Sequence, residues 1–343
     1  MKNIFINCLI SIIACISVCI LLELYIRIEE PPDHGKLYIK SKNKILKNEL
    51  MPNVDVVRLG KRVTINAGGY RGTYYKKDKD TQTFRIAVLG DSFTFGHGVT
   101  DEETYCAQLE KLLVNSSQSR TFEVLNFGVN DYTTQQEFEL FKVKVGAYNP
   151  DVVILGYYYN DLLHTVSSIK PDLRSEKKIA RERKKSMFDF QAKILRTVRK
   201  SYSLRFLTPR INALLRRFNI RGYGESGYFN YQYVSDSLPW QYNKKILLDF
   251  NKECKKRNAT LLVMLIVDAL KLDENYPYKE THEIVRSFCD SNNIVVLDLY
   301  KELKGQNFTR YRSTLLDAHP NKKLHGIYAK ILYNFISEHT LIN

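Results

Sequence analysis

The chain has 343 residues, of which 44% are hydrophobic and 26% are charged. That composition excludes a mostly disordered chain and suffices for one sizeable core with attachments or for two small domains. The formal charge of +15 is uneven, because residues 170–221 hold seventeen Lys/Arg against four Asp/Glu, a net +13. With no recognisable binding module joined to these basic residues, the sequence argues against nucleic acid as a partner.

The N-terminal residues carry a targeting signal. Residues 4–22 form an uncharged, apolar run of nineteen residues, long enough to cross a bilayer core. Lys2 precedes the run, whereas the residues that follow it are net negative, which predicts a cytoplasmic N-terminus and the rest of the chain outside. We therefore expect a single-pass signal anchor in the inner or cytoplasmic membrane. A cleaved signal peptide is the alternative, although no A-x-A-like site is present, and the lipoprotein-like box ending at Cys15 is followed by further apolar residues.

The predicted organisation has three parts. Residues 1–26 form a cytoplasmic tail and the anchor, and residues 27–80 form a stalk and a loosely packed entry segment ahead of the main body. The segment 65–72 (INAGGYRG) has turn chemistry and is expected to contact that body. Residues 81–343 form the main domain, interrupted by an insertion at about 165–238.

Five short apolar runs in the main domain are typical of buried strands: 85–89, 122–127, 152–155, 260–267 and 294–299. Helical patterns lie between them, for example the stripe of Phe138, Phe141 and Val145. Strands that alternate with helices predict an α/β fold with a parallel sheet covered on both faces and right-handed crossovers.

The cysteines outside the anchor are widely spaced. Cys106, Cys254 and Cys289 match neither a disulfide framework nor a zinc site. Buried free thiols are expected, with a Cys254–Cys289 bridge as the alternative.

Polar blocks follow the first three predicted strands, where functional groups gather in an open parallel sheet. Gly90-Asp91-Ser92 places a serine on a tight strand-to-helix turn, with its hydroxyl exposed and its N–H available to a developing oxyanion. The block from Asn126 to Tyr132 comes next. The third block ends in Asn160-Asp161, where Asn160 can donate to the same oxyanion or, as the simpler interpretation, cap a helix.

A fourth block, Asp317-Ala318-His319-Pro320-Asn321, precedes the last predicted helix. A histidine of near-neutral pKa can take the serine proton and return it to the leaving group. An aspartate can hold the ring in the useful tautomer. The simpler interpretation is a turn in which Asn321 caps the helix.

Together the four blocks resemble the GDSL/SGNH hydrolase family over about residues 84–335. The apolar N-terminus and residues 65–72 resemble a membrane-tethered bacterial branch of it. The resemblance implies a three-layer α/β/α sandwich with a flavodoxin-like parallel sheet of five strands in the order 2-1-3-4-5. It also implies Ser92 as nucleophile, His319 as base and Asp317 as its orienting partner, with no metal and no cofactor. The oxyanion would be held by the N–H of Ser92, a backbone N–H of the second block, and the side chain of Asn160.

This sequence departs from the family pattern at two places. Asp131 aligns with the glycine that supplies the second oxyanion N–H, and Gly128 is the alternative donor. An aspartate there must turn its carboxylate away from the oxyanion, and it tolerates unusual backbone angles less well than glycine. Asp317 is two positions before His319, whereas many relatives have three. His97, close to the serine in sequence, is expected to shape the pocket wall, with catalysis as the alternative.

The basic insertion carries an apolar stripe among its arginines, which predicts helices over or beside the site. Three roles stay open: a solvated cover, an interfacial helix on anionic lipid, or a grip on an acidic glycan or lipid substrate.

The resemblance predicts a serine esterase, with an O-acetyl esterase of cell-envelope carbohydrate as the leading activity. The partner is then an acylated small molecule or polysaccharide, together with the membrane through residues 4–22. An O-acyltransferase using the same serine, a lipid-ester hydrolase, and a catalytically silent glycan-binding or envelope-assembly protein are the alternatives.

Overall fold

The computed structural model describes residues 2–29, 35–116, 120–162, 233, 237–269, 272, 276–304, 311–313, 319–339 and 341. The chain divides into two units, one of His34–Ile169 with Tyr223–Asn343 and the other of Met1–Asp33 with Lys170–Gly222. Most of the predicted helical insertion, and Asp317 of the fourth block, lie outside the described residues.

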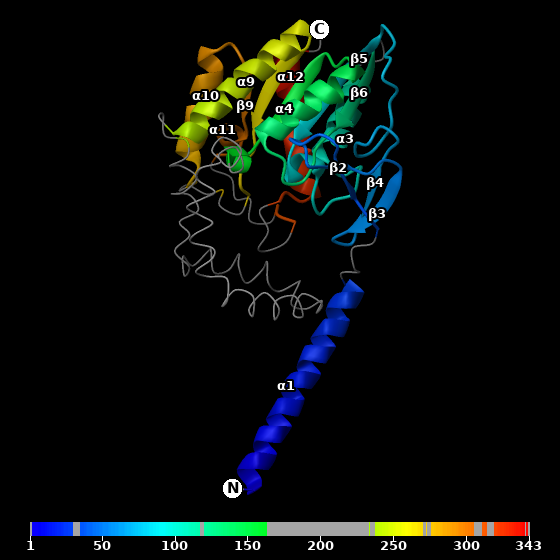
Figure 1. Ribbon diagram of the computed structural model, residues 1–343, viewed down its shortest axis with the longest axis vertical. Helices are drawn as coiled ribbons and strands as arrows, with labels where there is room; N and C mark the ends of the chain where they lie inside the picture. The colour runs from blue at the N-terminus through cyan, green and yellow to red at the C-terminus, as the bar shows by residue number, and fades with distance from the viewer. Residues whose placement is uncertain are drawn as a thin grey trace. The chain divides into compact units, whose positions relative to one another are not determined.

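The predicted anchor forms one helix, α1 (Lys2–Glu29), drawn in blue in Figure 1. Apolar side chains such as Ile10, Val18 and Leu21 are exposed on it. Among the residues that the structure describes, no helix combines the length and the apolar character that a membrane crossing needs. The predicted transmembrane span is therefore not supported by the structure.

The larger unit is built on a five-stranded sheet. Its strands are β5 (Thr83–Gly90), β6 (Thr121–Asn126), β7 (Val152–Tyr157), β8 (Thr260–Leu265) and β9 (Val295–Asp298). They are hydrogen-bonded in the order β6-β5-β7-β8-β9, and every neighbouring pair is parallel. The predicted parallel sheet and its 2-1-3-4-5 order are thus confirmed.

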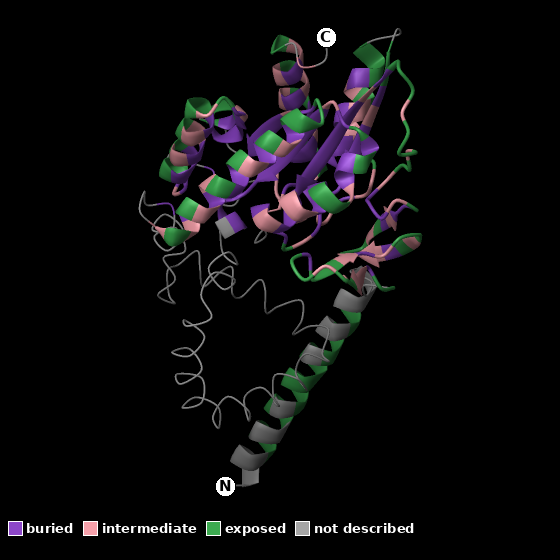
Figure 2. Ribbon diagram, turned by 45° about the horizontal axis from the view of Figure 1, so that its top comes forward, coloured by how far each residue is buried: buried purple, intermediate pink, exposed green. Residues whose placement is uncertain are grey.

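Helices cover both faces of this sheet (Figure 1). One face packs against α4 (Thr134–Val143), α9 (Leu238–Lys256) and α10 (Lys279–Ser291), with Ala87 and Leu89 of β5 among the buried residues. The opposite face packs against α3 (Tyr105–Ser116), α11 (Leu299–Leu303) and α12 (Lys322–Glu338), with Ile86 and Val88 of β5. Successive residues of one strand thus serve opposite layers, as the period of a β-strand requires, and Figure 2 shows the strands buried between half-exposed helices.

Residues 35–72 contribute to the same core. They form two antiparallel pairs, β1 (Tyr38–Lys40) with β2 (Asn48–Leu50) and β3 (Val54–Arg58) with β4 (Lys61–Ile65). Apolar side chains of this lead-in segment join the cluster that also holds residues of β6 and α4: Leu37, Leu46, Leu50, Val56, Val63, Ile65 and Tyr70. The segment is therefore part of the folded domain.

The cysteines of the domain are free thiols. Cys106, Cys254 and Cys289 are all buried, and the alternative Cys254–Cys289 bridge is not formed. Burial in apolar surroundings raises the pKa of Cys289 to about 12, with a smaller contribution from Asp290. The side chains act as small apolar core residues, as their spacing indicated.

Candidate active site

Ser92 begins a four-residue helix, α2 (Ser92–Phe95), directly after β5. The Asp91 carboxylate caps this helix by accepting a hydrogen bond from the N–H of Phe93 at 2.9 Å. The helix ends at Gly96, whose φ of 89° lies in the left-handed region that glycine adopts without strain. The sequence Gly-Asp-Ser thus forms the predicted tight turn, with Ser92 half-buried at its tip.

Two glycines, at the ends of the strands on either side of β5, allow α2 to lie against the sheet. A Cβ at Gly156, in β7, would come within 2.3 Å of Thr94 Oγ1, and a Cβ at Gly128, after β6, within 2.2 Å of the backbone N of Phe95. The side chain of Asn126 completes the contact by donating from Nδ2 to the carbonyl of Thr94 at 2.9 Å. The position of the Ser92 helix is therefore set by close backbone packing.

Arg71 of the lead-in segment holds the other end of α2. Its guanidinium is buried, and donates to the carbonyls of Phe95 and Gly96 at 2.7 Å each and of Val99 at 2.6 Å. It also pairs with Asp101 at 2.7 Å. No role for Arg71 was predicted from the sequence. The cue that the sequence offers is a single arginine among the glycines of a segment rich in turn residues.

The structure brings His319 to Ser92, although 227 positions separate them in the chain. His319 Nε2 lies 2.7 Å from Ser92 Oγ, within the reach that proton transfer requires. The imidazole lies against Phe93 and also against His97, each with a ring-centroid distance of 4.7 Å. His97 therefore contacts the predicted base, in keeping with a place in the pocket wall.

The backbone around His319 is fixed by short-range pairing. Its carbonyl accepts from the N–H of Ser313 at 2.8 Å, and the Asn321 side chain caps α12 by accepting from Lys323 and Leu324. The expected capping by Asn321 is therefore present. Asp317 lies outside the described residues, so its predicted role as orienting partner stays a prediction.

The second block distinguishes between the two predicted oxyanion donors. The N–H of Gly128 already donates to Oδ1 of Asn126 at 3.0 Å. Asp131 lies in a turn closed by Tyr132 N–H donating to the Val129 carbonyl at 3.1 Å, and its own N–H has no hydrogen-bond partner within the described residues. This geometry favours Asp131 as the donor.

Asp131 adopts the left-handed backbone conformation that its alignment with a glycine implied. Its φ is 64°, a conformation that Asn and Asp tolerate better than other non-glycine residues. The residue is exposed. Burial, and secondly the charge of Asp131, raise the pKa of Tyr38 in β1 to about 12, so the carboxylate acts on the lead-in segment.

Asn160 is in η2 (Tyr159–Leu162), the 3₁₀ turn that follows β7. The backbone thus places it at the same edge of the sheet as Ser92, since the register pairs Gly90 with Gly156. The structure does not describe its side chain. Its neighbour Asp161 is buried, and accepts from Thr134 Oγ1 at 3.1 Å and from the N–H of Tyr158 at 3.4 Å.

Behind these loops lie three buried carboxyl groups: Asp91, Glu137 and Asp161. Burial, and then the charges of Asp161 and Asp91, raise the pKa of Glu137 well above its ordinary value. Glu137 was not predicted as a site residue from the sequence. Its spacing from Phe141 and Thr134, which places it on the buried stripe of α4, is the feature that could have indicated its burial.

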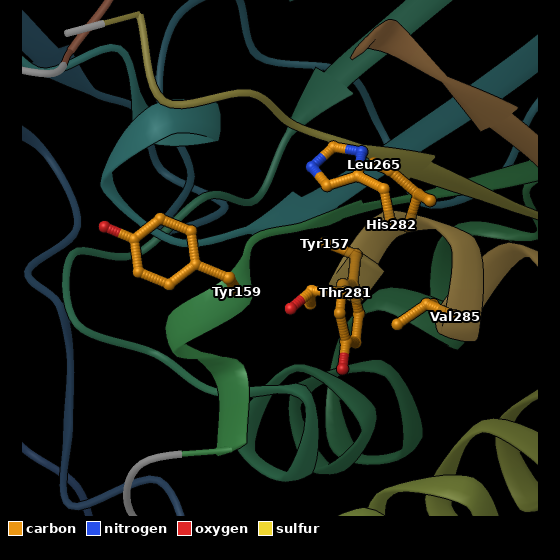
Figure 3. A pocket seen from close by; sticks show the side chains of 6 residues that line it. All are labelled: Tyr157, Tyr159, Leu265, Thr281, His282 and Val285. Carbon is orange, nitrogen blue, oxygen red and sulfur yellow. The ribbon is translucent and has the colours of Figure 1, made fainter. Parts of the chain in front are cut away.

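A second polar cluster lies between β8, α10 and β9. His282 Nδ1 is 2.7 Å from Asp298 Oδ1, and His282 Nε2 is 3.3 Å from the hydroxyl of Tyr276. His282 also lines a small cavity (Figure 3). Its other lining residues come from β7, η2, β8 and α10: Tyr157, Tyr159, Leu265, Thr281 and Val285. About 10 Å³ is open to the centre of a water molecule, which is room for one water and not for an acyl chain.

The model of the "GDSL-like Lipase/Acylhydrolase family" matches residues 88–327, more than half of the chain. No curated protein sequence matches significantly.

Solved structures that resemble the chain include three described as esterases or lipases. The acetyl xylan esterase AlAXEase is 17% identical with a TM-score of 0.41, covering 74% of this chain and all of that one. A two-domain esterase (CEX) active on acetylated mannans is 14% identical with a TM-score of 0.45, covering 75% and 49%. The lipase/acylhydrolase from Enterococcus faecalis is 12% identical with a TM-score of 0.43, covering 75% and 96%. Similarities this distant do not identify a substrate.

Proposed function

The chain belongs to the GDSL-like lipase/acylhydrolase family of ester-hydrolysing enzymes, and from this premise we propose that it cleaves a carboxylic ester through an acyl-enzyme on Ser92. The observation that carries the proposal is the 2.7 Å separation between Ser92 Oγ and His319 Nε2. An imidazole at that distance can accept the hydroxyl proton as the oxygen attacks the ester carbonyl.

The proposed reaction has two halves. Ser92 Oγ attacks the ester carbon while His319 Nε2 takes the proton, and His319 then returns that proton to the departing alcohol. Water next attacks the acyl-enzyme while His319 takes its proton, and His319 then gives that proton to Ser92 Oγ as the acyl–oxygen bond breaks and the acid is released. Asp317, by the family resemblance, holds the imidazole in the tautomer this transfer needs and stabilises the imidazolium.

The negative oxygen of each tetrahedral intermediate needs donors already in place. We assign them to the N–H groups of Ser92 and Asp131 and to the side chain of Asn160. The first two have no hydrogen-bond partner within the described residues, and all three residues follow adjacent strand ends. Loss of one such donor typically costs about 3–4 kcal/mol of transition-state stabilisation.

A fluorophosphonate probe tests the nucleophile directly. Wild type should label and should hydrolyse short-chain aryl esters, whereas Ser92→Ala should do neither and His319→Gln should label far more slowly. Ser116→Ala is a matched control, because Ser116 is at the end of α3 and its hydroxyl donates to the carbonyl of Leu113 in the same helix. Folded wild-type protein that fails to label would contradict the proposal and favour a catalytically silent protein.

The substrate we propose is an O-acetylated carbohydrate of the cell envelope, on the family resemblance alone. Acetate release from acetylated polysaccharides, compared with release of longer acyl chains from lipid esters, tests it. An O-acyltransferase remains the second candidate, since the same acyl-enzyme can pass its acyl group to a sugar hydroxyl. Product analysis with added glycan separates the two, because water as the dominant acceptor contradicts transfer.

The location we propose is the periplasmic or extracellular side of the inner or cytoplasmic membrane. Its support is the sequence of residues 4–22 and the charges that flank it. Full-length protein should stay with the membrane fraction through an alkaline carbonate wash, and its release would contradict the proposal.

A further inference from the structure

Each of the three loops that carry predicted oxyanion donors is joined to a buried carboxyl group. Asp91 immediately precedes Ser92, and Asp161 immediately follows Asn160. Glu137 is in the first turn of α4, the helix that begins three residues after Asp131. All three carboxyl groups are at most 1% exposed. The segments that meet at the site therefore also meet behind it, in a cluster of acids.

Hydrogen-bond donors are unequally distributed over this cluster. Asp91 accepts from the N–H of Phe93, and one oxygen of Asp161 accepts from Thr134. Both oxygens of Glu137, and Oδ1 of Asp161, are buried with no hydrogen-bond partner in the described residues. A buried carboxylate with no donor and no cation is far less stable than the neutral acid.

The groups that face Glu137 leave it no other way to neutralise its charge. Asp91 of the Ser92 turn and Asp161 of η2 repel a charge on it, and burial, then the charge of Asp91, also raises the pKa of Asp161 well above its ordinary value. Tyr105 of α3 and Tyr132 of the second block are also close enough for Glu137 to influence them, and both are neutral hydroxyls with raised pKa values. None of the described groups found to act on Glu137 is a lysine, arginine or histidine.

We propose that Glu137 carries a proton in the folded protein and, in that neutral form, acts as a positioning residue that holds the three site loops together. Ionised, it would add negative charge to a buried cluster that also holds the carboxyl groups of Asp91 and Asp161, and would drive apart the segments bearing Ser92, Asp131 and Asn160. Protonated, it removes that repulsion and supplies an O–H donor where carboxylate oxygens still lack one. The positioning part of this inference rests on the proposed function, whereas the protonation does not.

Linkage gives a test that needs no substrate. A folded-state pKa above the ordinary value of 4.5 means that Glu137 stabilises the fold fully below about pH 4.5 and that this stability is lost as pH rises toward the folded-state pKa. E137Q keeps the shape of the protonated acid and cannot ionise. Its melting temperature should exceed that of wild type by an amount that grows as pH rises from 6 toward 9, by up to roughly 2–4 °C per pH unit below the folded-state pKa.

E139Q is the matched control on the same helix. Burial raises the pKa of Glu139, but hydrogen bonds from Lys142 and Asn43 outweigh it and the pKa is lowered. The stability that ionised Glu139 adds to the fold is therefore fully present above about pH 4.5. The difference in melting temperature between E139Q and wild type should then be the same at pH 6 and pH 9.

Turnover tests the positioning role. E137A should lower kcat by roughly tenfold with KM little changed, and E137Q should restore kcat to within about threefold of wild type at pH 7, since misplacement of reacting groups is felt in the chemical step. Wild type should lose activity at alkaline pH relative to E137Q.

Two results would overturn the inference. The first is a melting temperature of E137Q that lies below wild type by the same amount at pH 6 and pH 9, which is expected for the loss of an ionised, paired carboxylate. An E137Q protein that does not fold, while E139Q folds, counts as the same result. The second is E137Q no more active than E137A. If wild type hydrolyses no ester at all, the proposed function fails, while the melting experiment still decides whether Glu137 is protonated.

Discussion

The segment that carries Ser92 and the segment that carries His319 are held in different ways. α2 packs on glycine backbone at two strand ends, and receives hydrogen bonds from Asn126 and the buried Arg71. The carbonyl of His319 accepts a hydrogen bond from the N–H of Ser313, and its ring touches α2 and the adjacent loop through Phe93 and His97.

The nucleophile and the base are therefore positioned by different contacts. The nucleophile is placed by the core, where displacement costs packing and buried hydrogen bonds together. The ring of the base contacts the nucleophile's own helix through Phe93, so a shift of α2 moves the surroundings of both groups. We therefore expect substitutions under α2 to have larger effects than substitutions around the imidazole.

The largest effect is expected for Gly128→Ala. The new Cβ would lie 2.2 Å from the backbone N of Phe95, and backbone cannot move aside as a flexible side chain can, so α2 must shift. A displacement of about 1 Å at reacting atoms costs on the order of 100-fold in rate. Fluorophosphonate labelling of Ser92 should fall by that amount in folded protein.

Gly326→Ala is the control for this prediction. Its new Cβ would meet the side-chain end of Gln108 on α3, and alanine favours the α12 helix by up to about 1 kcal/mol. Labelling and melting temperature should both hold or rise. Equal labelling of the Gly128 and Gly326 variants would show that α2 does not depend on close packing.

Arg71→Met should rank second. It leaves three buried carbonyls and Asp101 without their partner, which typically costs about 3–5 kcal/mol of unfolding free energy. Urea denaturation measures that loss, and kcat should fall more than KM rises. Arg62→Met is the control, because Arg62 pairs with Asp55 on an exposed edge. A kcat unchanged in folded Arg71→Met protein would confine Arg71 to a structural role.

Sequence alone was sufficient for the sheet and for the meeting of Ser92 with His319. Short apolar runs bounded by glycine and polar blocks mark buried parallel strands, and carboxyl ends of parallel strands share one edge. The strand signals are local and are combined by a general rule of topology, whereas the pairing of Ser92 with His319 was expected from the resemblance of the four blocks to the family. The same reasoning placed Asn160 in the turn after β7 and Asn321 as a helix cap.

What sequence reasoning missed depends on contacts between distant segments. Arg71 is 24 residues from Phe95, and nothing in either stretch alone shows that one donates to the other. Residues 27–80 were predicted as a stalk and a loosely packed entry segment, with only residues 65–72 expected to contact the main body, yet apolar side chains throughout residues 35–72 join the core that holds β6 and α4. Glu137 resembles an ordinary polar residue of an amphipathic helix until the fold closes over it.

His97 should matter moderately, through its contact with the His319 ring. A ring pair of this kind is worth about 0.5–1.5 kcal/mol, so His97→Ala should lower kcat/KM by roughly two- to tenfold. His97→Phe keeps an aromatic ring there and should stay within about threefold of wild type. A loss in His97→Phe as severe as that in His319→Gln would instead make His97 a proton-transfer group.

The smallest effect is expected for Asp131→Asn. Asparagine tolerates the left-handed φ of 64° and keeps the backbone N–H, so the substitution removes only a charge. Because the residue is exposed and water screens its carboxylate, the repulsion of the oxyanion is worth at most about 1 kcal/mol, and kcat should rise by no more than about fivefold. Asp55→Asn, an exposed aspartate on β3, should leave kcat unchanged. A fall of kcat in Asp131→Asn would mean that the carboxylate is needed, either to fix the turn through β1 or to meet the substrate, and the proposed oxyanion role of this position would then fail.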